Sequence, residues 1–334
     1  MTAATIQDGI ELTVREALNR ALDEAFESGE PIMHLGQDIG PHGGTFGVTR
    51  GLWEKYGESV IRDGPLCESA TVGFAIGLAI SGVRALVELE FFDFIGVAMD
   101  QVFNHAAKLH YFSGGKLKVP LIIRTPIVAR MGMGPQHSQS LEAWLMHIPG
   151  IKIALPSNAA DAYGLLRSAL REDNPVLFIE NARLYGRRGM VRIGSTVPFG
   201  KARIARAGTD VTIVAISAMV EEALSAAERL AEQGIEAEVI DPRTIAPLDM
   251  ETILNSLRKT MRLVVAHDAH KTGGVGAEIA ARCMEEAFDY LDAPVERVCA
   301  LDVPVPCAPA AIAAVYPNAD SIVAAVKRMG GGTS

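Results

Sequence analysis

The sequence predicts an α/β protein with two domains. Short, nearly continuous apolar segments alternate with segments of helical spacing along most of the chain, which is typical of a parallel sheet covered by helices on both faces. The alternation breaks once, at 182–200, where "ARLYGRRGMVRIGSTVPFG" is basic, glycine-rich and without periodicity. A chain of 334 residues is long enough for two domains that each have a core. We therefore place the domains at 1–190 and 191–334.

The elements of the first domain follow from hydrophobic spacing. Apolar residues at Ile10, Val14, Leu18, Leu22 and Ala25 predict one amphipathic helix over 10–28. After it, predicted strands alternate with predicted helices, and a parallel sheet is expected. The strands are 31–36, 84–92, 119–126, 151–157 and 174–180, and the helices are 69–82, 96–111, 139–147 and 158–171.

The second domain repeats the alternation over about 130 residues, an ordinary size for a single domain. The predicted strands are 210–217, 236–243, 262–268 and 295–302, and the helices are 220–233, 249–259, 275–288 and 319–328. The terminal segments "MTAAT" and "RMGGGTS" are expected to fray.

Composition excludes several classes of function. The net charge of −9 argues against nucleic acid or an anionic membrane as the main partner. The longest apolar run, 71–83, is too short to span a bilayer, and no basic-then-apolar signal segment opens the chain. The four cysteines have no CxxC spacing, which indicates reduced thiols, no structural zinc and a cytoplasmic location.

A glycine-rich turn in the second domain resembles a dinucleotide-binding fingerprint. In "VVAHDAHKTGGVGAEIAA", an alignment of GxGxxG on Gly274 and Gly276 puts Ile279 at the third glycine position, so the match fails. A tight strand–helix turn explains the segment better. Because such a turn also suits a phosphate at a helix N-terminus, an NAD-dependent oxidoreductase remains an alternative.

The segment "DGPLCESATVGFAIGLAISG" places Glu68 at the start of an apolar helix. A carboxylate there is commonly a capping residue or one that complements the helix dipole. Its neighbours Leu66, Cys67, Val72 and Phe74 are apolar, however, so we expect a poorly solvated carboxyl that exchanges a proton near neutral pH.

Two further features lie just past predicted strand ends, where ligands bind in open α/β sheets. Phe91, Phe92 and Phe94 follow one strand, and although such aromatics are usually core, one of them could face a flat ring. His137 follows another strand in the loop "GMGPQHSQSLEAW", where Ser138 and Ser140 are candidates to cap the next helix. A histidine at a helix entry needs no function by itself, but its placement beside Glu68 and the aromatics favours a site.

Several longer motifs extend this picture over essentially the whole chain. They include "PLCESATVGFAIGLA", "FFDFIGVAMDQVFNHAAKLHYFSGG", "GPQHSQSLEAWLMHIPGIKIALPSNAADAYGLL" and "EAEVIDPRTIAPLD". The chain resembles the beta subunit of the thiamine-diphosphate-dependent first component of 2-oxo acid dehydrogenase complexes, whose members act on pyruvate, branched-chain 2-oxo acids or acetoin. The resemblance implies a transketolase-like pyrimidine-binding domain followed by a transketolase C-terminal domain.

The resemblance also assigns roles to residues. Glu68 matches the glutamate that hydrogen-bonds a ring nitrogen of the aminopyrimidine and so promotes loss of the thiazolium C2 proton. Phe94 matches the aromatic that stacks on the pyrimidine, with the Leu66 backbone nearby, and His137 matches the active-site histidine near substrate and diphosphate. A potassium site built mostly from backbone carbonyls would fall on Leu121, Ala169, Leu170, Glu172 and Asn174.

The sequence lacks the GDG motif with which alpha subunits of the family hold Mg²⁺ and the diphosphate. The resemblance therefore implies half of a cofactor site, completed by an alpha subunit in an α2β2 assembly that passes its acyl group to a lipoyl-bearing acyltransferase core. The chain departs from the family pattern near the substrate side, at Arg130, His105, His110 and "AHDAH". Pyruvate is the expected substrate, and acetoin or a branched-chain 2-oxo acid remains open. A non-catalytic scaffolding subunit is a further alternative, which Glu68, Phe94 and His137 disfavour.

Overall fold

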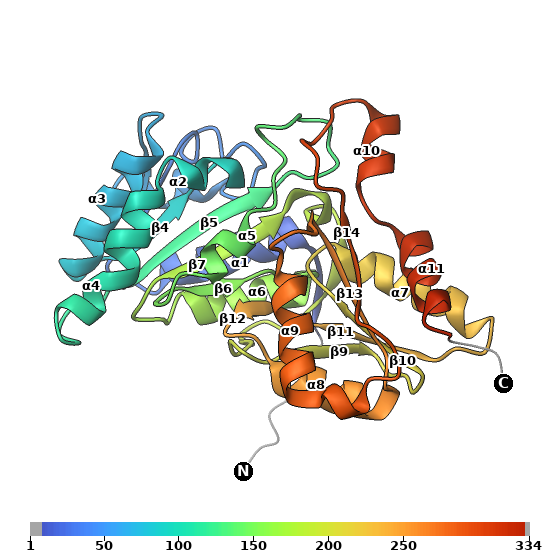
Figure 1. Cartoon of the computed structure of the whole chain (residues 1–334). Coiled ribbons are helices and arrows are strands. Elements are labelled where there is room, and N and C mark those ends of the chain that lie inside the picture. The colour runs from blue at the N-terminus through green and yellow to red at the C-terminus, as the bar shows by residue number, and fades with distance from the viewer. Residues whose placement is uncertain (1–8, 331–334) are drawn as a thin grey trace, which may run out of the picture.

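The computed structural model describes residues 9–330 and shows two α/β units built on two sheets (Figure 1). The terminal segments expected to fray are 1–5 and 328–334, and they lie outside the described residues except for 328–330, of which Arg328 ends a helix. The first sheet has seven strands in the order β12-β6-β7-β5-β4-β2-β3, and the second has five in the order β14-β13-β10-β11-β9. All neighbours are parallel except β12 and β9, which pair antiparallel at an edge of their sheets. The predicted fold class is confirmed, with these two antiparallel edges added.

The first sheet has helices on both faces. Its strands are β2 (Ile32–Gly36), β3 (Ile61–Asp63), β4 (Arg84–Glu88), β5 (Leu121–Ile127), β6 (Lys152–Ala154), β7 (Val176–Asn181) and β12 (Thr244–Ala246). The helical segments of this unit are α1 (Val14–Glu27), α2 (Leu52–Tyr56), α3 (Glu68–Ile80), a 3-10 turn Phe92–Gly96, a π turn Gln101–Ala106, α4 (Ala107–Phe112), α5 (Glu142–Met146), α6 (Ala159–Ala169) and a 3-10 turn Ala182–Leu184.

The second sheet carries α7 and α11 on one face and α8 and α9 on the other. Its strands are β9 (Arg203–Arg206), β10 (Val211–Ala215), β11 (Ala237–Asp241), β13 (Leu263–His270) and β14 (Glu296–Ala300). Its helices are α7 (Met219–Ala231), α8 (Met250–Thr260), α9 (Val275–Ala287), a 3-10 turn Phe288–Tyr290, α10 (Pro309–Val315) and α11 (Ala319–Arg328).

The predicted helix over 10–28 is wrong in its first turn. Ile10–Thr13 is a strand, β1, which pairs antiparallel with β8 (Arg188–Val191). Thr13 then starts α1, because its hydroxyl accepts from the Glu16 N–H while the Glu16 carboxylate accepts from the Thr13 N–H. This capping box fixes the helix start. The segment 182–200 therefore contains a strand, although its composition shows none.

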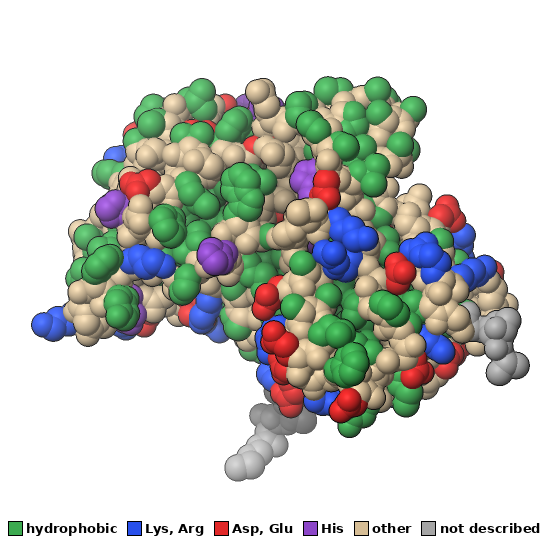
Figure 2. Space-filling model, in the orientation of Figure 1, with side chains coloured by type: hydrophobic (Ala, Val, Ile, Leu, Met, Phe, Trp, Pro, Cys, Tyr) green, Lys and Arg blue, Asp and Glu red, His purple; other side chains and the backbone are tan. Residues whose placement is uncertain are grey.

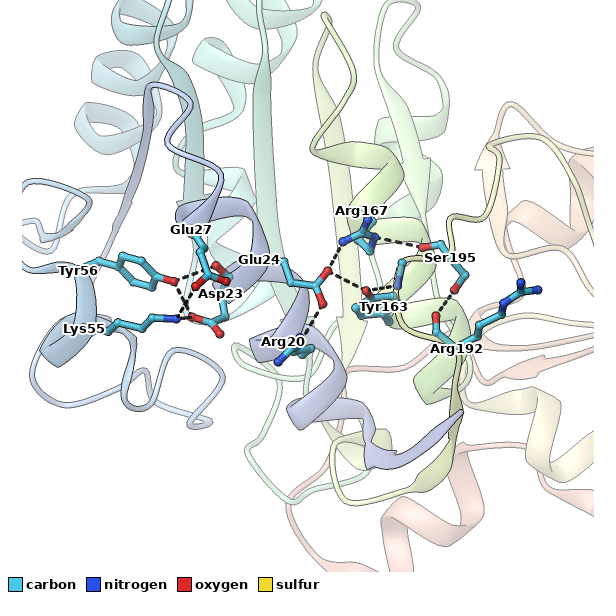
Figure 3. A network of polar contacts seen from close by, with 11 residues as sticks. Arg20, Asp23, Glu24, Glu27, Lys55, Tyr56, Tyr163, Arg167, Arg192 and Ser195 are labelled. Atoms are coloured by element: carbon cyan, nitrogen blue, oxygen red, sulfur yellow. Dashed lines mark hydrogen bonds and ion pairs between the residues drawn. The ribbon is translucent and has the colours of Figure 1, made fainter. Parts of the chain in front are cut away.

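Polar contacts hold α1 against its neighbours (Figure 3). On one side of the helix, Glu24 accepts from Arg20, from the Tyr163 hydroxyl at 2.8 Å and from Arg167, the last two on α6. On the other side, Asp23 accepts from Lys55 at 2.7 Å and from Tyr56 at 2.6 Å, both on α2. The network ties α1 to both α2 and α6 and lies over the apolar core that these helices share.

The two units share one continuous core. Residues of the first sheet, such as Ile123 and Ile153, and residues of the second unit, such as Ile240, Ile253 and Ile279, belong to one apolar cluster. Strand β12, which follows β11 in the chain, crosses over to pair with β6 of the first sheet. The 1–190 and 191–334 boundary stays a prediction, and β12 shows that the second segment contributes a strand to the first sheet.

Pro309–Arg328 has the length and hydropathy of a membrane-spanning helix, but two observations explain it as part of the fold. The segment is broken into α10 and α11, and half of it is buried inside the protein. Figure 2 shows hydrophobic and uncharged side chains over α10, whereas charged side chains gather lower down over α8 and α9.

Candidate active site

Glu68, Phe94 and His137 lie just past the carboxyl ends of three strands of the first sheet. Glu68 is the first residue of α3 after β3, Phe94 lies in the 3-10 turn after β4, and His137 lies in the loop after β5. We call residues 128–141 the His137 loop. Since β3, β2, β4 and β5 are consecutive parallel neighbours, their carboxyl ends form one edge of the sheet. This is the edge where open α/β sheets bind ligands.

The structure brings Phe94 and His137 into contact. The two rings meet edge to face, with centroids 5.3 Å apart, and His137 meets Phe91 in the same way at 4.9 Å. Phe92 is completely buried and Phe91 nearly so, whereas Phe94 is only half-buried. Of the three phenylalanines, Phe94 therefore has a ring that a ligand can reach.

Glu68 occupies the first turn of α3 without capping it. The N-cap is Cys67, and the helix start has no side-chain cap. Glu68 is half-buried, and its negative charge suits the helix N-terminus. The expected apolar surrounding is only partly present, because Leu66 is 70% exposed and Phe74 is 55% exposed.

The His137 loop is fixed to the aromatic turn by Asp93. One carboxylate oxygen of Asp93 accepts from the backbone N–H of Gln139 at 3.1 Å and from its side-chain amide at 2.9 Å. The expectation that Ser138 or Ser140 caps the next helix is wrong, because α5 starts at Glu142 and its N-cap Leu141 makes no side-chain bond. Ser138 is buried instead, and α5 is shorter than predicted.

A buried pair of side chains joins the residue that follows this loop to the second unit. Nε2 of His267, on β13, lies 2.6 Å from a Glu142 carboxylate oxygen, and both side chains are buried. Burial lowers the pKa of His267, but the Glu142 carboxylate outweighs it and the net shift is upward. The hydrogen-bonded pair of His267 and Glu142 therefore fixes α5 to β13. The pair could not be predicted from the sequence, because its members lie 125 residues apart.

A second buried polar network lies next to the aromatic residues. Arg124, on β5, donates to Glu88 at 2.7 Å and to both oxygens of Glu180, at 2.7 and 3.0 Å. Glu180 also accepts from the Tyr185 hydroxyl at 2.6 Å. Burial raises the pKa of Glu88, which Arg124 opposes.

From Tyr185 the contacts continue through aromatic rings. Tyr185 packs on Phe46 at 5.8 Å, and Phe46 packs on Phe91 at 5.9 Å. Phe91 in turn contacts both Phe94 and His137. A chain of contacts thus runs from buried charges to the rings of the candidate site.

The residues of the expected potassium site lie at the amino ends of the strands, at the opposite end of the sheet from the candidate active site. Four of them occupy the end of α6 and the turn before β7, and Leu121 starts the adjacent strand β5. The side-chain oxygen of Asn174 is buried and has no hydrogen-bond partner within residues 9–330, which suits a cation ligand. The Glu172 carbonyl already accepts from Arg84 at 2.7 Å. Among the described residues, no group of three His, Cys, Asp or Glu side chains could hold a metal ion.

The glycines of the fingerprint-like segment serve close packing. A Cβ on Gly276 would lie 3.2 Å from Val265, and one on Gly274 would lie 2.6 Å from the His270 carbonyl oxygen. The predicted tight turn between β13 and α9 is confirmed. The four cysteines, all within the described residues, are unpaired.

Two family profiles cover most of the chain. The transketolase pyrimidine-binding domain matches residues 10–187, and the transketolase C-terminal domain matches residues 200–322. Among solved structures, a split-gene transketolase described as an inactive beta4 tetramer superposes with a TM-score of 0.81 at 25% identity, and covers 96% of this chain and 100% of its own.

Three curated relatives are beta subunits of the pyruvate dehydrogenase E1 component. The protein of Dictyostelium discoideum is 44% identical over 96% of this chain and 91% of its own. The beta-2 subunit of Oryza sativa subsp. japonica is 45% identical over 95% and 86%, and the protein of Bos taurus is 43% identical over 97% and 92%. The lone NAD-dependent oxidoreductase finds no support in these matches.

The expected cytoplasmic location is contradicted by the same relatives, all of which are named mitochondrial. The prediction rested on reduced cysteines, and unpaired thiols are compatible with any reducing compartment. Cysteine usage therefore could not decide between the two locations.

Fold, domain profiles and relatives over nearly the full length agree. The chain belongs to the family of beta subunits of the pyruvate dehydrogenase E1 component.

Proposed function

We propose that this chain provides the aminopyrimidine side of a thiamine diphosphate site and that, with an alpha subunit, it decarboxylates pyruvate and transfers the acyl group to lipoamide. The contact between Phe94 and His137, at the sheet edge that also carries Glu68, is the observation that supports it most strongly. It places a reachable aromatic ring beside a group that can transfer protons.

The three side chains have separate roles in this proposal. Thiamine diphosphate, when bound, supplies the carbon nucleophile and the electron sink for loss of CO₂ from a 2-oxo acid. Glu68 holds a proton at a pyrimidine ring nitrogen by a hydrogen bond. Phe94 orients the pyrimidine by stacking. His137 hydrogen-bonds the substrate or the lipoyl sulfur and moves a proton during acyl transfer.

The alpha subunit is proposed from two observations. The sequence lacks the GDG motif for Mg²⁺ and diphosphate, so we propose that the alpha subunit holds both. Large apolar side chains are also exposed around Glu68 and on the neighbouring helices, which indicates a face that another chain covers. They are Leu66, Phe74, Val97, Phe103 and Phe112. Covering this face would exclude water from the carboxyl. A site without water favours a decarboxylation that disperses charge.

We also propose that potassium binds at the carbonyls of Leu121, Ala169, Leu170 and Glu172, together with Asn174. The buried, unpartnered Asn174 oxygen supports this site. Thermal unfolding in KCl and NaCl at equal ionic strength tests it. Higher stability in KCl, lost in Asn174→Ala, is expected, and equal stability in both salts would exclude a selective site.

The main proposal is tested with Glu68→Gln in the chain assembled with its alpha subunit. Exchange of the thiazolium C2 proton, followed by NMR, should slow by at least about a hundredfold, because a general acid–base contribution of this kind is worth about 10²–10⁴. Glu58→Gln, which alters an exposed carboxylate before α3, is the matched control and should exchange at the normal rate. Normal exchange in Glu68→Gln would refute the role of Glu68. Assays with pyruvate, a branched-chain 2-oxo acid and acetoin then identify the substrate.

A further inference from the structure

The second unit holds the His137 loop at both ends. Arg130, near the start of the loop, donates from Nη2 to the Pro317 carbonyl oxygen at 2.5 Å, and its guanidinium lies 5.1 Å from the centre of the Tyr316 ring. At the other end, the Tyr316 hydroxyl donates to the carbonyl oxygen of Ser138 at 3.3 Å. Tyr316 therefore contacts residues on both sides of His137.

The segment before α10 limits movement of the same loop. A Cβ on Gly134 would lie 3.0 Å from the Cys307 sulfur, and one on Gly132 would lie 3.4 Å from the Cys307 carbonyl oxygen. Both glycines have positive φ, so other residues would be strained there. Figure 1 shows this loop, between β5 and α5, beside the chain that leads into α10.

The anchors lie immediately next to His137 in the sequence. Ser138 is held by Tyr316 of the second unit, and Gln139 is held by Asp93 of the first. Tyr316 is almost completely buried. Burial, with the nearby Asp268 carboxylate, raises the pKa of Tyr316, so its hydroxyl keeps its proton and donates at neutral pH.

We propose that Tyr316, assisted by Arg130, is a positioning residue that fixes His137 for acyl transfer. This inference rests on the proposed role of His137. Tyr316 itself contacts no reacting group in this proposal. It acts through the Ser138 backbone, so the second unit sets where the imidazole stands above Phe91 and Phe94.

The test compares Tyr316→Phe, which removes the hydroxyl, with Tyr316→Leu, which also removes the ring beneath Arg130. Each is assembled with the alpha subunit. Lipoamide-linked turnover should fall about two- to tenfold in Tyr316→Phe, the effect of one hydrogen bond, and further in Tyr316→Leu. The KM for the 2-oxo acid should stay unchanged. Tyr290→Phe, an exposed tyrosine of the same unit beside Arg258, is the matched control and should keep full turnover.

A double-mutant cycle separates positioning from a general structural effect. In a His137→Ala background, Tyr316→Leu should cause no further loss, because both changes remove the same contribution. Multiplicative losses would overturn the inference. If His137→Ala alone keeps full activity, the proposed role of His137 is wrong, and the positioning role of Tyr316 falls with it.

Limited tryptic digestion gives a readout that does not depend on activity. In the native chain Arg130 is held by Pro317 and Tyr316, so cleavage after it should be slow. Tyr316→Leu should speed cleavage after Arg130, while cleavage after Lys116, in an exposed loop, should not change. Unchanged cleavage after Arg130 would show that Tyr316 does not hold the loop and would overturn the inference. Together with His137→Ala, this measurement separates failure of the positioning role from failure of the proposed function.

Discussion

The imidazole of His137 meets the ring of Phe94 edge to face, with centroids 5.3 Å apart and the ring planes at 89°. Phe91 meets the same imidazole at 4.9 Å and also at 89°. Two perpendicular contacts restrict rotation of the imidazole and orient it with respect to the reachable face of Phe94. The imidazole is therefore held in one orientation beside the ring of Phe94.

The first prediction concerns removal of this imidazole. His137→Ala should lower overall activity at least about a hundredfold, because a general acid–base role is worth about 10²–10⁴. The larger loss should fall on transfer to lipoamide rather than on decarboxylation with an artificial acceptor. The melting temperature should change little, since His137 is only half-buried. His147→Ala, in an exposed position after α5, is the control. Near-normal rates in both assays would leave His137 without a catalytic role.

The second prediction concerns the isolated chain. Without the alpha subunit it should bind thiamine diphosphate and Mg²⁺ at least about tenfold more weakly than the assembled pair, a difference of about 1.4 kcal/mol. The reason is the missing GDG motif and the open face around Glu68. Isothermal titration calorimetry measures both affinities. Equal affinity of the isolated chain would contradict a divided site.

Much of the fold could be predicted, because buried parallel strands and amphipathic helices carry strong local patterns. The helix predicted over 158–171 forms as Ala159–Ala169, and the helix predicted over 319–328 forms as predicted. β12 could not be predicted, because it has only three residues and pairs with a strand some 90 positions earlier. The first turn of the predicted helix 10–28 became β1 because pairing with β8 outweighed helical spacing.

The candidate site could be predicted only in part. Glu68, Phe94 and His137 follow strand ends, so topology alone places them on one edge. The residues that hold the His137 loop could not be found in this way. Tyr316 lies 178 residues from Ser138, and no pattern in either segment indicates their hydrogen bond.

The third prediction concerns His267 and pH. Its pKa in the folded protein is raised above the ordinary 6.5 because the Glu142 carboxylate outweighs burial, and Asp268 also favours the charged form. A raised pKa stabilises the folded state fully below pH 6.5, and this contribution is lost as pH rises through the raised pKa. The free energy of unfolding should therefore fall across that window, measured by chemical denaturation at several pH values.

His267→Gln should abolish this pH dependence. It should also lower stability by about 3–5 kcal/mol, because Glu142 stays buried without its charged partner. His147→Gln, which changes an exposed histidine, should keep both the stability and the pH dependence. If the pH dependence of stability survives in His267→Gln, it comes from another titrating group.

The last prediction concerns Glu24 on α1. Its carboxylate accepts from Arg20 on the same helix and from Tyr163 and Arg167 on α6, and its side chain is 17% exposed (Figure 3). Glu24→Gln keeps the shape but removes the charge that both guanidinium groups face. The free energy of unfolding should fall by about 1.5–3 kcal/mol, the range for hydrogen bonds to a charged group. Glu27→Gln, one turn further along α1 and 68% exposed, should change it by less than about 1 kcal/mol. Urea denaturation of both variants makes the comparison, and equal losses would show that the contacts between α1 and α6 owe their stability to apolar packing alone.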